Sequence, residues 1–555
     1  MDKTYFTRKM PQLRAFDKDV FVNQTGYHKN RRKIAVIKSE CTQFYVKDEC
    51  GDIKYKSEVS HFGIDTDSQD DVYIADFSLL CCEGTFYIET DTKKRSVKFE
   101  ISDSCCDKVF DDVCKAFYFL RCGTELKAEH AGKYSHPVCH CASAVEWSDR
   151  DIMLDVSGGW HDAGDYGRYV TAGACALAHI LFAYRLFPEA FKSQKLNIPE
   201  SNNSMPDMLC ECRYELDWLL KMQKSDGGVY HKATTSHHAP FIMPQDDLGQ
   251  MYVFDVSSMA TADFAAICAL ASRIYAEYDK KYSQKLLRAS VKSYQWLEQN
   301  PDFIGFENPK GCNTGCYGER DDFDNRFWAA SELFCTTGDE KYHTDMKNSL
   351  QQHSFPVFAL GYGCTSGLGA FSYIFDAKNP DIDILQSFRK EFVVAAERFA
   401  ALADKCGYGA AMETRDWCWG SNMNIGKRAM IFIIADKIEN KNRFSDYACA
   451  QLDFLLGVNA TGYSFVTQNG EFSSNYPHLR PAHADGIDEC IPGMVCGGPN
   501  RFPADPDAKL LIRPSTPPMK CYADDVGCYS LNEITIYWNS PVVFLCAYIK
   551  EKYKN

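Results

Sequence analysis

The chain has 555 residues, of which 45% are hydrophobic and 25% charged, a composition typical of a soluble globular protein with more than one domain. Its net charge of −14 argues against nucleic acid or an anionic membrane surface as a partner. The longest apolar stretch, residues 170–186, is interrupted by His179 and Arg185, so no membrane span is expected.

The N-terminal segment carries charges without an apolar stretch behind them, so we expect no secretory signal and a cytoplasmic protein. A secreted mature form, from which a signal has been removed, is the alternative. In a long chain without a signal, the 26 cysteines are expected to be reduced. Most would be small buried hydrophobes, and a few would be metal ligands.

Residues 20–104 form the first predicted domain, which follows an N-terminal tail of residues 1–19. Short segments rich in β-branched and aromatic residues alternate there with polar turns, a pattern typical of a small β-sandwich. The expected strands are residues 33–38, 44–46, 72–77, 84–88 and 96–101.

Residues 105–555 form the second predicted domain, which is mainly helical. About a dozen segments repeat apolar residues at helical spacing, and no short internal repeat is visible. A dozen helices in one domain favour a barrel of helical hairpins, with functional loops at one end. Residues 458–529 are mostly loop, and so long a loop indicates binding or catalysis. The expected helices are residues 107–121, 168–187, 205–222, 259–278, 283–299, 325–337, 366–377, 384–404, 421–438, 441–457 and 530–550.

The stretch DVSGGWHDAGDYGRYV, residues 155–170, concentrates aspartates and glycines at the start of the helical domain. Asp162 and Asp165 are three positions apart around Gly164, so one short turn can aim both carboxylates at one cavity. Two close carboxylates compete for protons, which is how acid–base sites are tuned. A surface loop with Asx turns is the alternative.

Two later segments carry further candidate groups. Glu533 stands where a final helix is expected to begin, among apolar residues that would raise its pKa and suit a general acid. An ordinary first-turn glutamate is the alternative. His478 and Arg480 lie in a loop rich in Gly, Asn and Ser, and can hydrogen-bond sugar hydroxyls or a phosphate.

Two cysteines and two histidines, Cys122, Cys139, His140 and His161, form a set suited to tetrahedral zinc, although their spacing is not that of a zinc finger. Because four protein ligands leave no open position, the zinc would be structural. His161 directly precedes Asp162, so a bound metal would hold the aspartate turn in place.

These segments together resemble glycoside hydrolase family 9, the endoglucanase and cellodextrinase family, in its subgroup with an N-terminal immunoglobulin-like domain. The resemblance covers almost the whole chain and implies a small all-β immunoglobulin-like sandwich followed by a mainly α (α/α)6 barrel. Phe472 departs from the family, which usually has a polar or basic residue there. The resemblance rests on residues 20–27, 117–123, 135–140, 155–165, 464–480 and 522–540.

The resemblance also implies inverting hydrolysis of a β-1,4 glycosidic bond. Asp165 would be the general base, Asp162 would help hold the attacking water, and Glu533 would be the general acid. An inverting pair of carboxyls stands roughly 6.5–9.5 Å apart to leave room for that water. His478 and Arg480 would bind the sugar beside the cleaved bond.

Further residues are implied in the surroundings of the site. Tyr522 and Asp524 would shape the environment of the acid. Trp160, Trp417 and Trp419 are candidate sugar-stacking aromatics, with packing beneath the loop as the alternative for Trp417 and Trp419.

Family members with the same ligand pattern carry zinc on the Cys122, Cys139, His140 and His161 set. A calcium loop is also implied, with Asp321 and Asp324 as candidate ligands, and a solvated acidic loop is the alternative. Two departures count against calcium, because Asn325 stands where an acid is frequent and the segment of residues 361–364 lacks an expected aspartate.

The leading hypothesis is therefore a hydrolase of β-1,4-linked glucans or gluco-oligosaccharides such as cellodextrins. An exo-β-glucosaminidase acting on chitosan or chito-oligosaccharides is the alternative, for which Asp246 and Asp247 could supply an additional acid. A scaffold protein that lost catalysis is disfavoured by the intact carboxylates. Hydrolysis at the zinc is disfavoured by its four protein ligands.

Overall fold

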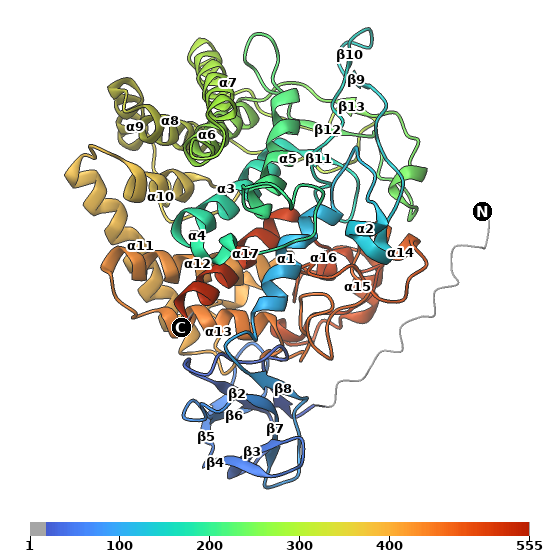
Figure 1. Cartoon of the computed structure of the whole chain (residues 1–555), viewed down its shortest axis with the longest axis vertical. Coiled ribbons are helices and arrows are strands. Elements are labelled where there is room, and N and C mark those ends of the chain that lie inside the picture. Colours follow the sequence, from blue (N-terminus) through green and yellow to red (C-terminus); the bar gives the residue numbers. More distant parts are fainter. Residues whose placement is uncertain (1–17, 554–555) are drawn as a thin grey trace.

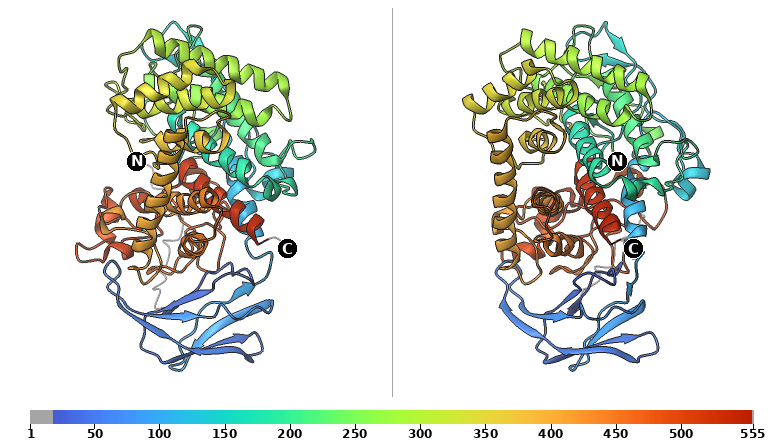
Figure 2. Two further views of the ribbon diagram at one scale, coloured as in Figure 1. Left: turned by 90° about the vertical axis from the view of Figure 1, so that its left-hand side faces the viewer. Right: turned by 60° about the vertical axis from the view of Figure 1, so that its left-hand side comes forward.

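The structure, a computed structural model, describes residues 18–553 and consists of a small β domain beneath a larger helical domain (Figures 1 and 2). The expected order, a β-sandwich followed by a mainly helical barrel, is confirmed. Most of the predicted N-terminal tail lies outside the described residues. Among the described helices, none combines the length and apolar character needed to cross a bilayer.

The small domain is a sandwich of two four-stranded sheets. Its edge strands β4 (Ile53–Glu58) and β5 (Ser60–Ile64) were not predicted. Charged and polar residues dominate β4, and such residues protect a sheet edge from further pairing. Strand β5 is short and irregular at Gly63. In sheet order, the strands are β1 (Val20–Phe21), β2 (Ile34–Ile37), β6 (Asp71–Asp76) and β5 (Ser60–Ile64), and then β4 (Ile53–Glu58), β3 (Gln43–Asp48), β7 (Gly84–Thr90) and β8 (Phe99–Ile101).

The helical domain pairs an inner ring of helices with an outer one. The inner helices are α3 (Val170–Leu186), α6 (Ser258–Tyr275), α8 (Phe323–Thr337), α10 (Ser366–Asp376), α12 (Ser421–Glu439) and α17 (Ile536–Lys552). The outer helices are α1 (Asp107–Phe119), α5 (Asp207–Lys221), α7 (Lys280–Gln299), α9 (Glu340–Gln352), α11 (Ile382–Ala403) and α13 (Ser445–Leu455). Only α9 was not predicted, because its sequence EKYHTDMKNSLQQ buries few side chains.

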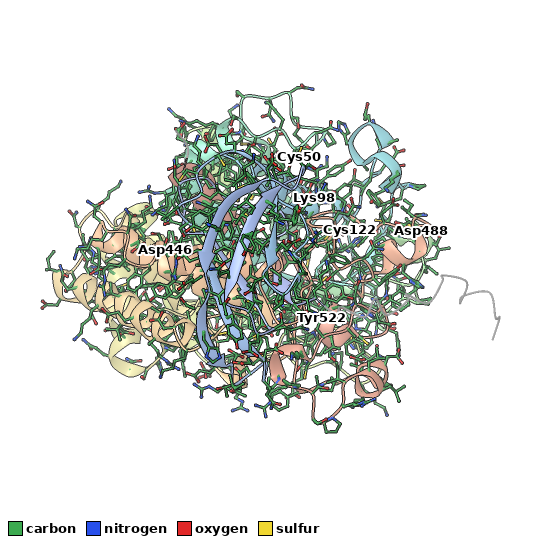
Figure 3. All side chains as sticks on the ribbon, turned by 90° about the horizontal axis from the view of Figure 1, so that it is seen from below. Cys50, Lys98, Cys122, Asp446, Asp488 and Tyr522 are labelled. Atoms are coloured by element: carbon green, nitrogen blue, oxygen red, sulfur yellow. The ribbon has the colours of Figure 1, made fainter. Side chains whose placement is uncertain are left out.

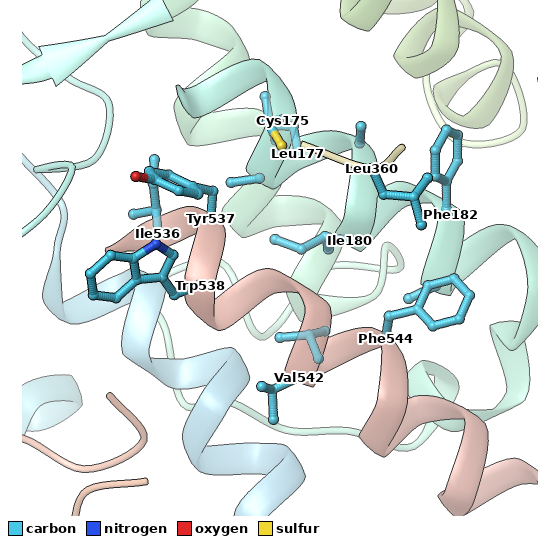
Figure 4. Close-up of a cluster of buried hydrophobic side chains, with 14 of the residues drawn as sticks. Cys175, Leu177, Ile180, Phe182, Leu360, Ile536, Tyr537, Trp538, Val542 and Phe544 are labelled. Carbon is cyan, nitrogen blue, oxygen red and sulfur yellow. The ribbon is translucent and has the colours of Figure 1, made fainter. Parts of the chain in front are cut away.

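Burial distinguishes the two rings. Helix α3 is buried at every position from Val170 to Tyr184, as expected for a helix enclosed on all sides, whereas α7 buries one face only. Helix α3 packs against α6 and α17. Figure 4 shows the α3–α17 contact, formed by Cys175, Leu177, Ile180, Phe182, Ile536, Tyr537, Trp538, Val542 and Phe544.

Short elements gather at the end of the barrel that carries the 155–170 stretch. A five-stranded sheet with the order β10-β9-β13-β12-β11 lies there, and β11 begins directly after the aspartate turn. These elements are β9 (Ala144–Glu146), β10 (Met153–Leu154), β11 (Arg168–Tyr169), β12 (Lys232–Thr234), β13 (Tyr252–Val253), α2 (Ala128–Ala131), α14 (Arg480–Ala484), α15 (Pro506–Leu511) and α16 (Tyr529–Asn532). Helix α4 (Pro188–Lys192) instead follows the far end of α3 and contacts α17.

A buried ion pair joins the two domains. Arg31 of the sandwich binds Asp453 of α13 through two hydrogen bonds of 2.8 and 2.5 Å, and Asn23 donates to the same carboxylate at 2.7 Å. Figure 3, a view from below, shows the sandwich strands lying across the helical domain. The two domains therefore share a specific polar interface.

Replacing Arg31 by alanine should lower the free energy of unfolding by about 3–5 kcal/mol, because it leaves the Asp453 carboxylate buried without its cation. Denaturant-induced unfolding measures the loss. Arg32→Ala is the matched control, since Arg32 is exposed and stands 4.0 Å from its partner Asp76. Equal stability of the two variants would contradict a structural role for the pair.

Candidate active site

Three segments that are distant in the sequence are joined by backbone hydrogen bonds at one end of the barrel. The N–H of Arg480 donates to the carbonyl of Gly164 at 3.2 Å, and the N–H of Ile536 donates to that of Asp162 at 2.8 Å. His478 and Glu533 form a parallel β-bridge. The acid-bearing segment is thereby held against the aspartate turn.

The meeting point encloses a cavity of about 470 Å³. Asp162, Asp165 and Glu533 all line it, so the structure brings the three predicted carboxylates together. The other lining residues are Ala163, Tyr169, His238, Gly315, Cys316, Tyr317, Tyr362, Trp419, Met423, Thr535, Tyr537 and Trp538.

Asp165 is buried and strongly hydrogen-bonded through one carboxylate oxygen. Its Oδ2 accepts from the N–H of Gly167 at 3.1 Å and the hydroxyl of Tyr169 at 3.2 Å, and lies 3.3 Å from Nδ1 of His238. Burial alone would raise the pKa of Asp165, but the hydrogen bond and charge of His238, with Arg480 and Gly167, lower it well below the usual range. Asp165 is thus held as a carboxylate.

Asp162 has a different environment three residues earlier. Its Oδ2 accepts a 2.5 Å hydrogen bond from the hydroxyl of Tyr317, while its Oδ1 is buried and has no partner among the described residues. Burial and the nearby charge of Asp165 raise the pKa of Asp162, against the opposing effect of Tyr317. Oδ1 is therefore the oxygen of Asp162 that no described protein donor occupies.

Glu533 lies in an extended break between two helices. Helix α16 ends at Asn532 and α17 begins at Ile536, so the expectation that a final helix begins at Glu533 is wrong. Thr535 caps α17 instead, by accepting a hydrogen bond from the N–H of Trp538. Burial, followed by the charges of Asp165 and Asp162, raises the pKa of Glu533 well above its usual range. The group is therefore suited to carry a proton.

His478 and Arg480 lie near the aspartate turn, and their side chains are hydrogen-bonded to backbone carbonyls of the protein. The guanidinium of Arg480 donates to the carbonyls of Gly164 at 2.5 Å and of Ala239 at 2.7 Å. Nδ1 of His478 lies 2.7 Å from the carbonyl of Val526, and burial lowers the pKa of this imidazole to about 4. Arg480 thus supports the aspartate turn, whereas the side chain of His478 is bonded to the segment that precedes Glu533.

Tyr522 and Asp524 support the loop that carries His478. The hydroxyl of Tyr522 bonds Ser474 at 2.6 Å, and the carboxylate of Asp524 accepts from the N–H groups of Asn475 and Tyr476 at 2.8 and 2.9 Å. Neither residue lines the cavity.

Of the three predicted stacking tryptophans, only Trp419 lines the cavity, where it is 44% exposed. Trp160 is buried beneath the turn, and its Nε1–H donates to Glu211 at 2.8 Å. Trp417 is fully buried and donates to Asp67 of the sandwich at 2.8 Å. The stacking assignment is therefore corrected for Trp160 and Trp417, since buried rings present no face to a ligand.

The predicted zinc ligands form one cluster. The ligand atoms of Cys122, Cys139, His140 and His161 lie within 4.8 Å of one another. Nδ1 of His140 and Nε2 of His161 are buried without hydrogen-bond partners, while Nε2 of His140 lies 3.3 Å from Asp247. Two thiols, two inward nitrogens and an outer carboxylate fit a tetrahedral zinc site.

The predicted calcium ligands do not form such a cluster. Asp321 is exposed, and Oδ2 of Asp324 accepts from the N–H of Thr365 at 2.5 Å. The amide of Asn325 donates to Asp263 at 3.0 Å. Within residues 18–553, the Cys/His set is the one group that has metal-ligand geometry.

Several cavity residues carry no sequence signal. Tyr317 comes from the loop before α8 and has a φ of 51°, a backbone conformation that is uncommon outside glycine. Tyr362 and His238 come from two other segments. They meet the aspartates only because the barrel ends converge, which no local motif records.

Comparison with known proteins gives matches over nearly all of the chain. A model described as glycosyl hydrolase family 9 matches residues 107–546, and one described as a cellulase N-terminal ig-like domain matches residues 15–95. A cellodextrinase of Butyrivibrio fibrisolvens is 44% identical over 96% of this chain and 100% of its own.

Solved structures agree with this. AaCel9A in complex with cellobiose-like isofagomine has a TM-score of 0.90 at 31% identity, covering 96% of this chain and 100% of that one. A Zn-binding triple mutant of the family 9 endoglucanase J30 has a TM-score of 0.89 at 33% identity, covering 94% of this chain and 99% of that one.

Proposed function

The chain belongs to glycosyl hydrolase family 9, and from this premise we propose that it hydrolyses β-1,4 bonds of gluco-oligosaccharides such as cellodextrins. The observation that carries the proposal is one cavity lined by Asp162, Asp165 and Glu533, in which the pKa of Asp165 is lowered and that of Glu533 raised. Carboxyl groups with opposite pKa shifts are suited to opposite proton-transfer roles.

The proposed reaction is inversion by direct attack of water. Asp165 takes a proton from the water, which Oδ1 of Asp162 helps to hold, while Glu533 gives its proton to the leaving glycosidic oxygen. One proton is gained by Asp165 and one is lost by Glu533, so the protein's charge is unchanged. Tyr317, by binding the other oxygen of Asp162, would fix the direction of its free one.

Zinc is proposed on Cys122, Cys139, His140 and His161. Support comes from the donor set, its two unpartnered nitrogens and the family structure whose description names zinc binding. The role of a bound zinc would be structural, since four protein ligands complete its tetrahedral coordination and leave no position for a water. The adjacent residue Asp162 would thereby gain a rigid backbone anchor.

A glucan substrate is favoured over an amino sugar. An additional acid from Asp246 or Asp247 would have favoured the amino sugar, but neither residue lines the cavity, and Asp247 faces His140 instead. A product profile tests the choice: we expect rapid cleavage of cellotetraose and none of chitosan tetramer under the same conditions. Preferential cleavage of the chitosan tetramer would contradict the glucan assignment.

A further inference from the structure

His238 is a cavity residue that no motif singled out. Its Nδ1 lies 3.3 Å from Oδ2 of Asp165, and its side chain is 39% exposed at the cavity wall. It is therefore in contact with the proposed base and also open to the space that a substrate would enter.

The loop that carries His238 is held on both sides. The carbonyl of Ser236 accepts from the N–H of Asn313 at 2.9 Å, and that of Ala239 accepts from Arg480 at 2.7 Å. A backbone fixed two residues before and one residue after His238 limits where its imidazole can lie. The contact with Asp165 is thus built into the loop rather than left to a free side chain.

The carboxylate of Asp165 is held asymmetrically. The N–H of Gly167 and the hydroxyl of Tyr169 donate to Oδ2, and Nδ1 of His238 lies 3.3 Å from the same oxygen. Nδ1 of His238 must carry its proton to donate there, because an unprotonated nitrogen would face a carboxylate lone pair. With Oδ2 occupied, Oδ1 is the oxygen able to receive a proton from water.

We propose that His238 is a positioning residue for the base, which directs the carboxylate of Asp165 through Oδ2 so that Oδ1 faces the attacking water. The inference rests on the proposed function. His238 acts through Asp165 and transfers no proton to or from the substrate. Of the three groups around Oδ2, His238 is the one presented by a separate loop, so its side chain can be removed without changing the backbone of the aspartate turn.

The charges around Asp165 fix the direction of the pH effect. Removing the hydrogen bond and charge of His238 raises the pKa of Asp165, because both lower it in the native protein. Asp165 must be ionised to act as a base. In a variant without His238, the acidic limb of the enzyme's pH profile would therefore move to higher pH. The ionisable groups that interact with Asp165 are Asp162, Tyr169, Lys232, His238, His478, Arg480 and Glu533.

The test compares His238→Ala and His238→Asn with the full-length native enzyme on cellotetraose. In the alanine variant we expect kcat to fall about 10–100-fold with KM changed less than about 3-fold, and the acidic limb of kcat/KM to move to higher pH. Asparagine should recover most of kcat, because its side-chain amide nitrogen occupies the same branch position as Nδ1.

His237→Ala is the matched control, since His237 is the exposed neighbour of His238. Among the described residues, its Nδ1 contacts only Ser236. Unfolding midpoints of all variants confirm that each is folded. An alanine variant with native kcat and acidic limb, or with only KM raised, would overturn the positioning role. Asp165→Asn, measured alongside, tests the proposed function separately. Loss of activity in this variant would support that function, and full activity would refute it.

Discussion

Replacing Asp165 by asparagine should lower kcat on cellotetraose by about 10³-fold, and replacing Glu533 by glutamine should do the same. Both changes keep the side-chain volume, so folding should be unaffected. The two variants should separate on an aryl cellobioside with an acidic phenol as leaving group. Such a phenol departs without protonation, so Glu533→Gln should recover most of its rate there, whereas Asp165→Asn should remain inactive because water must still be deprotonated.

The pH dependence follows from the same pair. Activity requires an ionised Asp165, so it falls as the pH drops through the pKa of Asp165. It also requires a protonated Glu533, so it falls as the pH rises through the pKa of Glu533. Because the first pKa is lowered and the second raised, the native plateau should be wide. Glu533→Gln should lose the alkaline limb, since glutamine does not titrate.

Asp155→Asn is the matched control, since Asp155 belongs to the same stretch but is exposed and paired with Lys221 outside the cavity. It should retain native kcat. Equal loss in Asp155→Asn and Asp165→Asn would indicate general damage to the turn. Full activity in either Asp165→Asn or Glu533→Gln would remove that residue from its proposed role.

Loss of the proposed zinc site should have the largest effect on stability. Cys122→Ser should lower the free energy of unfolding by more than about 4 kcal/mol, because Cys122 is itself fully buried and would be one of four ligands of the metal. The backbone already joins the two ligand segments: Cys122 N–H donates to Gly159 and His161 N–H to Leu120, both at 2.7 Å. Activity should fall afterwards, as the aspartate turn loses its anchor.

Cys141→Ser is the control for this variant, since Cys141 is an exposed thiol two residues from Cys139 and outside the cluster. Metal analysis of the purified chain should find one zinc per native chain and per Cys141→Ser chain, and markedly less in Cys122→Ser. Denaturant unfolding gives the stability of each. A Cys122→Ser midpoint equal to that of the native chain would refute the structural role.

Sequence patterns predicted the helices and strands that depend mainly on the residues within each segment. Apolar periodicity located most barrel helices, while α9 and β4 were missed because polar residues dominate them. Strand β5 was missed because it is short and irregular at Gly63. Asp162 and Asp165 could be predicted because a short turn can place both carboxylates. His238 and Tyr317 could not, because their positions depend on loops that meet only in the folded barrel.

The error at Trp160 has a related cause. In an extended turn, neighbouring side chains point to different sides. Trp160 therefore enters the core, His161 the metal cluster and Asp162 the cavity. Nearness in sequence to a catalytic motif did not imply nearness to the substrate.

Trp417 and Trp419 stand two positions apart, one bonded to Asp67 in the β domain and the other on the cavity wall. Thr414, just before them, also donates to Asp67, at 2.6 Å. The small domain consequently supports the segment that carries Trp419, on one wall of the cavity. Truncating the chain to its barrel would remove this support and also Arg31, the partner of Asp453. The β domain should therefore be kept when the enzyme is shortened or fused to another protein.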